Sequence, residues 1–238
     1  THDQSSAASD VYKRQGYYRS TENNLTYKPG ADFFLEQYLE NDVIQIDGKA
    51  YGLEFSLKKP SGRINGWMNY TWAKSLLKSN GNSISETINS NQWYNSEFDR
   101  PHTFNGTINF ETDKFNTWSF NFTAQSGRPY TVANGVFEIN DKAVPIFLER
   151  NNSRLPFYHR LDFSWKVAYN KDDYDRWRGD WTLTIYNLYG AKNPLNRYYT
   201  EKNGSQFGNF FGKSPLGSFN LSVVNSVFVS ISYNFKFQ

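Results

Sequence analysis

The stretch Val227–Phe237, VFVSISYNFKF, places apolar and polar side chains on opposite sides of one extended segment. Every second residue from Val227 is apolar, whereas Ser230, Ser232, Asn234 and Lys236 stand between them. Successive side chains of a β-strand point to opposite faces. This alternation is typical of a strand that faces lipid on one side and an aqueous lumen on the other, so we expect a membrane-spanning strand here.

The same alternation recurs six times upstream. Each segment carries leucine, isoleucine or an aromatic residue at about every second position, with serine, threonine, asparagine or a charged residue between. Each is roughly nine to thirteen residues long, which suits a tilted strand crossing a bilayer. Helical spacing explains none of them. The segments are 49–58, 63–75, 103–111, 117–125, 157–169 and 181–189.

Short and long links alternate between these segments. The links 59–62, 112–116 and 170–180 are short, whereas 76–100, 127–156 and 190–225 are long. Transmembrane barrels have short periplasmic turns and longer extracellular loops. The sequence therefore predicts an all-β fold in which antiparallel strands run up and down, with every long link at one end.

Composition excludes several other classes of protein. The 238 residues have a mean hydropathy of −0.74, and no segment approaches the ~20 apolar residues that a transmembrane helix needs. The chain has no cysteine, which excludes disulfides, thiol nucleophiles and cysteine–metal sites. Its net charge of +3 is too small and too dispersed to indicate nucleic acid, and three histidines offer little for a metal site.

The first fifteen residues are set apart from the fold. Ser5–Gln15, SSAASDVYKRQ, resembles the one-frame translation of an adapter used in sequencing libraries, and this segment does not have the pattern of a signal peptide. We expect Thr1–Gln15 to be a non-native tail and Gly16 to lie within a longer gene. The alternative is a disordered polar N-terminus.

Five blocks in chain order resemble the C-terminal barrel segments of TonB-dependent outer-membrane receptors. The resemblance covers nearly all of 16–237. The blocks are GKAYGLEFSLKK (48–59), GWMNYTWAKS (66–75), FDRPHTFN (98–105), RLPFYHRLD (154–162) and YNLYGAKNP (186–194).

The resemblance implies that 16–238 is the C-terminal part of a barrel of about 22 strands. This chain would supply about eight of them, counting a partial strand near 17–28, and would form an open curved sheet in isolation. The plug domain and the periplasmic box that contacts TonB would lie in the missing N-terminal part. The implied location is the outer membrane of a Gram-negative cell.

The implied function is active transport. Such a receptor binds a scarce nutrient (a siderophore, a vitamin or a glycan) at its extracellular loops and imports it with energy transmitted by TonB. The implied partners are outer-membrane lipid, the TonB complex, the barrel assembly machinery and the small-molecule or glycan ligand. Tyr233, Phe235 and Phe237 would form the assembly signal. Members of the family typically end on the aromatic residue itself, whereas here Gln238 follows Phe237.

The expected long loops are rich in aromatic residues, which suit ligand capture because rings supply contact area. The alternative is that these rings pack the loops against one another. The substrate-binding candidates are Trp93, Tyr94, Phe98, Tyr198 and Tyr199, with further loop rings at Tyr130, Phe137, Phe147, Phe207, Phe210 and Phe211. Tyr70, Trp72, Trp118, Trp165 and Tyr169 are expected instead at the membrane interface.

Catalytic chemistry is not indicated. Asp99, His102, His159 and Asp162 stand at strand entrances, where charged groups most often pair across the ladder, and no nucleophile elbow, phosphate loop or metal motif accompanies them. We expect no enzyme activity, catalytic residue, cofactor or metal. Two alternatives to a receptor remain open: a small structural or adhesive eight-strand barrel that does not transport, and a secreted carbohydrate-binding sheet protein.

Overall fold

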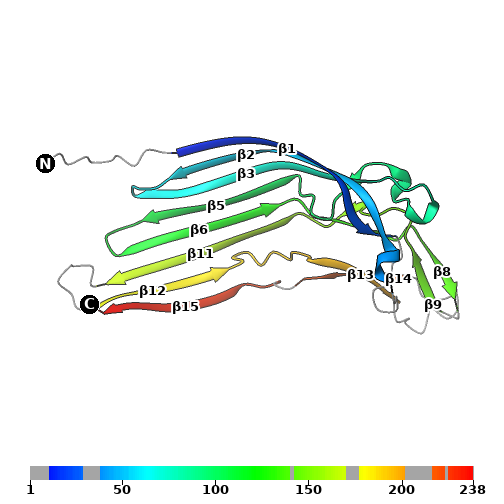
Figure 1. Cartoon of the computed structure of the whole chain (residues 1–238). Helices are drawn as coiled ribbons and strands as arrows, with labels where there is room; N and C mark the ends of the chain where they lie inside the picture. The colour runs from blue at the N-terminus through cyan, green and yellow to red at the C-terminus, as the bar shows by residue number, and fades with distance from the viewer. Residues whose placement is uncertain are drawn as a thin grey trace, which may run out of the picture.

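Eight long strands form one antiparallel sheet and follow one another across it in chain order (Figure 1). The computed structural model describes residues 11–28, 38–139, 142–169, 177–201, 216–222 and 225–237. The strands are β1 (Val11–Tyr27), β2 (Val43–Lys59), β3 (Ile64–Ser79), β5 (His102–Glu111), β6 (Asn116–Gln125), β11 (Tyr158–Tyr169), β12 (Trp177–Tyr186) and β15 (Phe228–Phe237). The predicted all-β, up-and-down architecture is confirmed.

The sheet is curved and open. Strands β1 and β15 lie at its two edges, and the path of paired strands runs from one to the other without joining them. Figure 1 also shows the short links at the end of the sheet near both termini and the long links together at the opposite end, here called the loop end. This separation follows from the alternation of short and long links in the sequence.

The register of the ladders keeps one face largely apolar from β2 to β15. Phe120 on β6 lies opposite Ile108 on β5 and Phe163 on β11. Phe163 in turn lies opposite Ile185 on β12, which faces Val229 on β15. Because directly paired residues point to the same side of a sheet, these ladders join apolar rows to apolar rows and polar rows to polar rows. The edge strand β1 departs from the pattern, since Arg14 lies opposite Phe55.

The predicted strands match the observed ones, with differences at their ends. The expected strand 181–189 is wrong at both ends, since β12 begins at Trp177 and stops at Tyr186. Asn187 adopts a left-handed backbone conformation with φ of 54°, which ends the strand before Tyr189. Strands β2 and β3 both extend further toward the loop end than the alternation indicated.

Strand β1 begins at Val11 and pairs with β2 along its length. Its first five residues therefore belong to the segment that the sequence analysis sets apart, while 1–10 lie outside the described residues. Pairing at a sheet edge uses backbone N–H and C=O groups, so it accepts a segment of any origin.

The loop end contains short elements that the sequence pattern did not indicate. Three two-stranded ribbons pair β7 with β10, β8 with β9 and β13 with β14, while β4 adds to β3. The short strands are β4 (Tyr94–Asn95), β7 (Pro129–Tyr130), β8 (Gly135–Ile139), β9 (Lys142–Ile146), β10 (Ser153–Arg154), β13 (Asn196–Glu201) and β14 (Leu216–Leu221). The 3₁₀ turns are η1 (Leu39–Asp42), η2 (Ile84–Glu86) and η3 (Asn89–Asn91).

A small hydrophobic core lies at the base of these loops. Ile44, Ile88 and Tyr94 are buried together, and Leu77 on β3 packs against them. The buried Ser79 hydroxyl accepts a hydrogen bond from the Ile88 N–H at 2.8 Å. This cluster fixes the first long link on the end of β3.

Candidate functional site

The apolar face of the sheet carries large side chains that the described chain does not bury. Phe55 is 44% exposed, Phe120 37% and Ile231 67%. Monomeric soluble proteins rarely expose a contiguous apolar surface of this kind. The face therefore needs an apolar environment outside the described chain.

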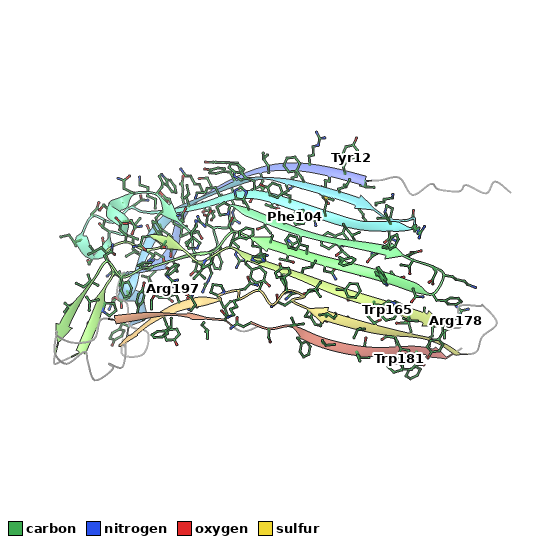
Figure 2. The ribbon with its side chains drawn as sticks, turned by 180° about the vertical axis from the view of Figure 1, so that it is seen from behind. Tyr12, Phe104, Trp165, Arg178, Trp181 and Arg197 are labelled. Atoms are coloured by element: carbon green, nitrogen blue, oxygen red, sulfur yellow. The ribbon has the colours of Figure 1, made fainter. Side chains whose placement is uncertain are left out.

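The apolar face ends in aromatic residues near the short links, here called the turn rim (Trp118, Trp165, Trp181 and Tyr233). Trp165 donates a hydrogen bond from Nε1 to Asn116 Oδ1 at 2.9 Å, and the Trp181 and Tyr233 rings lie 4.7 Å apart. Figure 2 shows Trp165 and Trp181 at this end of the sheet and Arg197 at the other. Rings that combine an apolar body with a bonded polar atom are typical of a membrane interface.

A second aromatic boundary lies at the loop end of the same face, here called the loop rim (Tyr70, His102, His159 and Tyr189). Tyr70 Oη and His102 Nδ1 are 2.8 Å apart, and so are Tyr189 Oη and His159 Nδ1. Polar atoms thus mark both ends of a band whose middle is made of leucine, isoleucine, valine and phenylalanine.

The opposite face is polar and is bonded across the ladders. Thr107 donates to Asn121 Oδ1 at 2.7 Å, and Ser119 donates to Asn109 Oδ1 at 2.7 Å. Near the turn rim, Lys166 forms an ion pair of 3.2 Å with Asp180. These side chains satisfy one another in rows, which suits a surface in contact with water or a polar partner.

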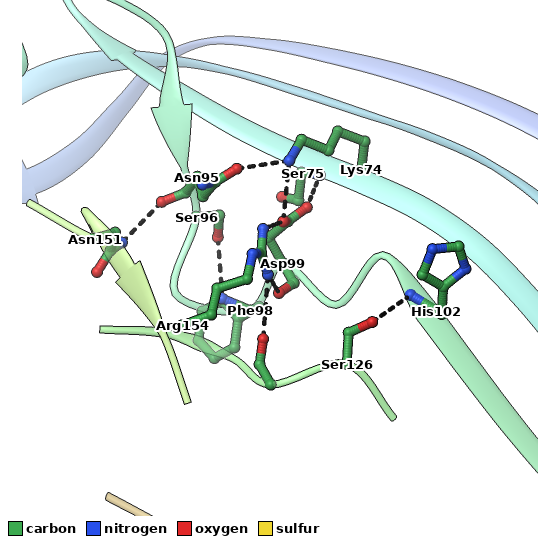
Figure 3. Close-up of polar contacts among 11 residues, drawn as sticks. Lys74, Ser75, Asn95, Ser96, Phe98, Asp99, His102, Ser126, Asn151 and Arg154 are labelled. Atoms are coloured by element: carbon green, nitrogen blue, oxygen red, sulfur yellow. Dashed lines mark hydrogen bonds and ion pairs between the residues drawn. The ribbon is translucent and has the colours of Figure 1, made fainter. Parts of the chain in front are cut away.

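The buried carboxylate of Asp99 ties three segments together at the loop end (Figure 3). Asp99 Oδ1 accepts the Ser75 N–H at 2.6 Å, while Oδ2 pairs with Lys74 at 3.4 Å and with Arg154. Arg154 also donates to the Asp99 carbonyl oxygen at 2.9 Å and to the Gly127 carbonyl oxygen at 3.2 Å. The cluster joins β3 to the bases of two long links.

The other acidic and histidine residues considered for catalysis also have partners within the fold. Asp162 pairs with Arg160 at 2.9 Å and accepts the Asn187 N–H at 2.9 Å. His102 and His159 belong to the loop rim. Within the described part of the chain, no three histidine, aspartate or glutamate side chains gather where they could hold a metal ion.

The five predicted ligand residues do not converge on one place. Lys49 Nζ lies 4.0 Å from the centre of the Trp93 ring, Tyr94 is buried in the loop-base core, and Phe98 is 79% exposed. Tyr198 stacks on Phe219 within the β13–β14 ribbon. Tyr199 packs against Phe147 with ring centres 6.1 Å apart.

A cavity of about 590 Å³ gathers some of these loop rings. Tyr199, Phe147 and Leu148 contribute apolar surface, and Arg150 and Arg197 contribute charge. The backbone N–H and C=O of Arg150 both bond to the Asn89 amide at 2.7 and 2.9 Å. The second and third long links thus meet the first around this cavity, whereas Phe207, Phe210 and Phe211 lie outside the described residues.

A second cavity, of about 420 Å³, lies where the polar face meets the loop end. Its lining includes Arg100, Arg128 and Arg160, here called the arginine cavity residues. Arg160 lies within the alternating segment 157–169, but none of the three arginines was a predicted site residue. The position of each arginine in the sequence could have indicated this site. Each one stands at the loop end of β5, β6 or β11, and these three strands are neighbours in the sheet.

The proposed assembly residues lie on the edge strand β15. Tyr233 packs against Trp181, and Phe235 is 62% exposed at the turn end of the apolar face. Phe237 is the last residue of the strand and pairs with Trp177. The edge that would present them is free of a second strand in the described sheet.

No helix among the described residues is long and apolar enough to cross a membrane. No protein-family model matches the chain, and no curated protein and no solved structure matches it either.

Proposed function

We propose that this chain forms part of the wall of an outer-membrane β-barrel that serves as an active-transport receptor. In this role, the apolar face contacts lipid, the polar face lines the lumen, and the long links reach the outside of the cell. The observation that carries the proposal is the uncovered apolar band bounded by the turn rim and the loop rim. A bilayer supplies both the apolar cover and the two interfaces that this band requires.

The open edges favour a large barrel over a closed eight-strand one. Strands β1 and β15 each pair on one side only in the described sheet, and unpaired edges within a bilayer are very unfavourable. Further strands from the same protein would pair with both edges. The charged residues on the polar face, such as Glu54 and Lys166, also suit a wide, wet lumen better than the filled interior of an eight-strand barrel.

Transport driven by TonB rests on the resemblance of the five sequence blocks to TonB-dependent receptors. The long links and the two cavities at the loop end suit a ligand captured from outside the cell. The ligand would bind at these loops and be imported when TonB acts on a plug domain of the receptor. This chain would contribute wall and loops.

Depth-resolved spin labels on the intact protein in lipid vesicles test the membrane orientation. Labels at Phe55, Phe120 and Ile231 should contact acyl chains, whereas labels at Glu54, Asn121 and Ser230 should contact water. The reverse pattern would contradict the proposal that this chain forms part of a barrel wall.

Uptake by cells tests transport separately. Cells that express the intact protein should accumulate a labelled iron, vitamin or glycan source, and accumulation should stop when the inner-membrane proton gradient is dissipated. A non-transporting structural or adhesive barrel would insert in the membrane but would show no uptake that depends on this gradient.

A further inference from the structure

The arginine cavity is basic and has no acidic residue in its lining. Arg100, Arg128 and Arg160 bring three guanidinium groups to a space of about 420 Å³, within the usual size of a small-molecule site. The rest of the lining mixes hydroxyl and amide groups with Tyr158 and Leu195. The space can thus hold both the charged part and the carbon framework of a ligand.

Their positive charge is only partly balanced by the fold. Arg160 pairs with Asp162 at 2.9 Å, and this is the only carboxylate partner of the three arginines among the described residues. Arg128 donates to the Leu195 carbonyl oxygen at 3.0 Å, and Arg100 donates to the Gln125 side-chain oxygen. Two of the three positive charges therefore have neutral partners, unlike Arg154, which pairs with the buried Asp99 carboxylate.

In two of these guanidinium groups, the Nε–H also lacks an acceptor. The Nε atoms of Arg128 and Arg160 are buried and have no hydrogen-bond partner within the described chain. A buried donor without an acceptor costs on the order of 1–3 kcal/mol. A guanidinium that turns toward a bound oxyanion would recover this energy and form the paired hydrogen bonds that arginine makes with carboxylate and phosphate.

We propose that this cavity binds a small, multiply charged oxyanion that carries carboxylate or phosphate groups. The proposal rests on the proposed function, because it assigns a chemical class to the nutrient that the receptor captures. Three convergent guanidinium groups favour a ligand with two or more negative charges. Tyr158 and Leu195 provide a partly apolar surface for its carbon framework.

Binding of two probe anions to the intact protein in lipid nanodiscs tests this assignment. Citrate represents polycarboxylates, pyrophosphate represents phosphates, and glucose serves as an uncharged probe. We expect calorimetry to detect one of the two anions, with an affinity that falls as salt rises because charges in a wet cavity are screened. Glucose should not bind.

The double variant R100Q/R128Q should weaken the binding of that anion by about tenfold or more, because two of the three charges are lost. Arg63→Gln is the matched control. It makes the same change at the turn end of β3, where Arg63 Nε donates to the Glu111 carbonyl oxygen at 3.3 Å, and it should change the affinity less than about twofold. Circular dichroism should show equal strand content in the wild type, the double variant and the Arg63 variant, so that a difference in affinity reflects the lost charges.

Three results would overturn the proposal: no binding of either anion, equal affinity in the double variant and the wild type, or equal loss in the Arg63 variant. These results are distinct from failure of the proposed function. Spin labels that contradict the membrane wall would leave the measured anion affinity intact. If instead the labels on the apolar face contact lipid but neither anion binds, only the ligand assignment is removed.

Discussion

Asp99 and Arg154, which lie 55 positions apart in the chain, form an ion pair on a carboxylate whose side chain is fully buried. Lys74 and the Ser75 N–H complete the set of donors. The pair joins the first long link to the second at the point where both leave the sheet. Because Arg100 and Leu155, the chain neighbours of the pair, line the arginine cavity, the pair holds part of that lining in place.

Asp99→Ala should destabilise the protein by about 2–3 kcal/mol. The substitution leaves the Ser75 N–H without its acceptor and two cations without their anion, although the side chains of Arg154 and Lys74 are about 30% exposed and can hydrate. Urea unfolding of the intact protein in lipid vesicles measures this. Glu97→Ala, on an exposed side chain nearby, is the control, and an equal effect of both variants would contradict a structural role for the pair.

The two faces of β6 should respond oppositely to the same charge. Phe120→Arg should cost about 2–4 kcal/mol because it puts a guanidinium in the middle of the apolar band. Asn121→Arg should cost less than about 1 kcal/mol, since it loses the 2.7 Å bond from Thr107 but lies opposite Asp162 in the ladder. Unfolding in lipid vesicles compares them, and similar losses would contradict the two-sided sheet.

The sheet could be predicted from the sequence because the side-chain pattern that specifies each strand lies within one short segment of the chain. A period of two in the side chains fixes which residues share a face, and the positions of short and long links fix which strands are neighbours. Phe120, Ile108 and Phe163 could therefore be placed on one face before their register was known. The strand ends were harder, because the stop of β12 depends on the backbone of Asn187 and its contacts with Ala191.

The candidate site could be predicted only in part because it depends on contacts between distant links. A list of loop aromatics does not distinguish Tyr94, which is buried in the loop-base core, from Phe98, which is exposed. Nothing local in the sequence pairs Arg154 with Asp99 either. The arginine cavity residues could have been found by combining the strand order with the position of each arginine at a strand end.

Gly52 on β2 should tolerate no side chain. A Cβ there would lie 2.5 Å from the Trp72 carbonyl oxygen and 3.0 Å from the Tyr17 ring. Since the first of these is backbone, Gly52→Ala must push β2 away from β3, at a cost of about 2 kcal/mol. Gly106→Ala on β5 is the control, because its nearest neighbours are side-chain atoms at 3.4 Å. The prediction fails if both variants unfold at the same urea concentration.

Tyr94→Phe should change how stability depends on alkaline pH. Burial raises the pKa of the Tyr94 phenol above its usual value of 10.0, although the nearby Arg150 charge acts in the opposite direction. The hydroxyl makes no hydrogen bond of normal geometry in the described chain, so Arg150 acts on it chiefly through its charge. Tyr94 lies in β4, in the long link between β3 and β5 and outside the eight strands of the wall.

The direction of the pH effect follows from the raised pKa. Below pH 10 the phenol is protonated in both the folded and the unfolded protein, and its contribution to stability is fully present. Between the unfolded and the folded pKa only the unfolded chain loses the proton, so the free energy of unfolding falls by up to about 1.4 kcal/mol for each pH unit. Tyr94→Phe removes this loss, and it also removes a buried hydroxyl that lacks a good partner.

Unfolding free energies of the wild type and the Tyr94→Phe variant at pH 8 and pH 11 measure the difference directly. The variant should match or slightly exceed the wild type at pH 8 and exceed it clearly at pH 11, since the two proteins differ only in this one phenol. Tyr198→Phe, on a side chain that is 49% exposed, should show no such divergence. If the unfolding free energy changes equally between pH 8 and pH 11 in all three proteins, Tyr94 is not held in an apolar core at the base of the loops.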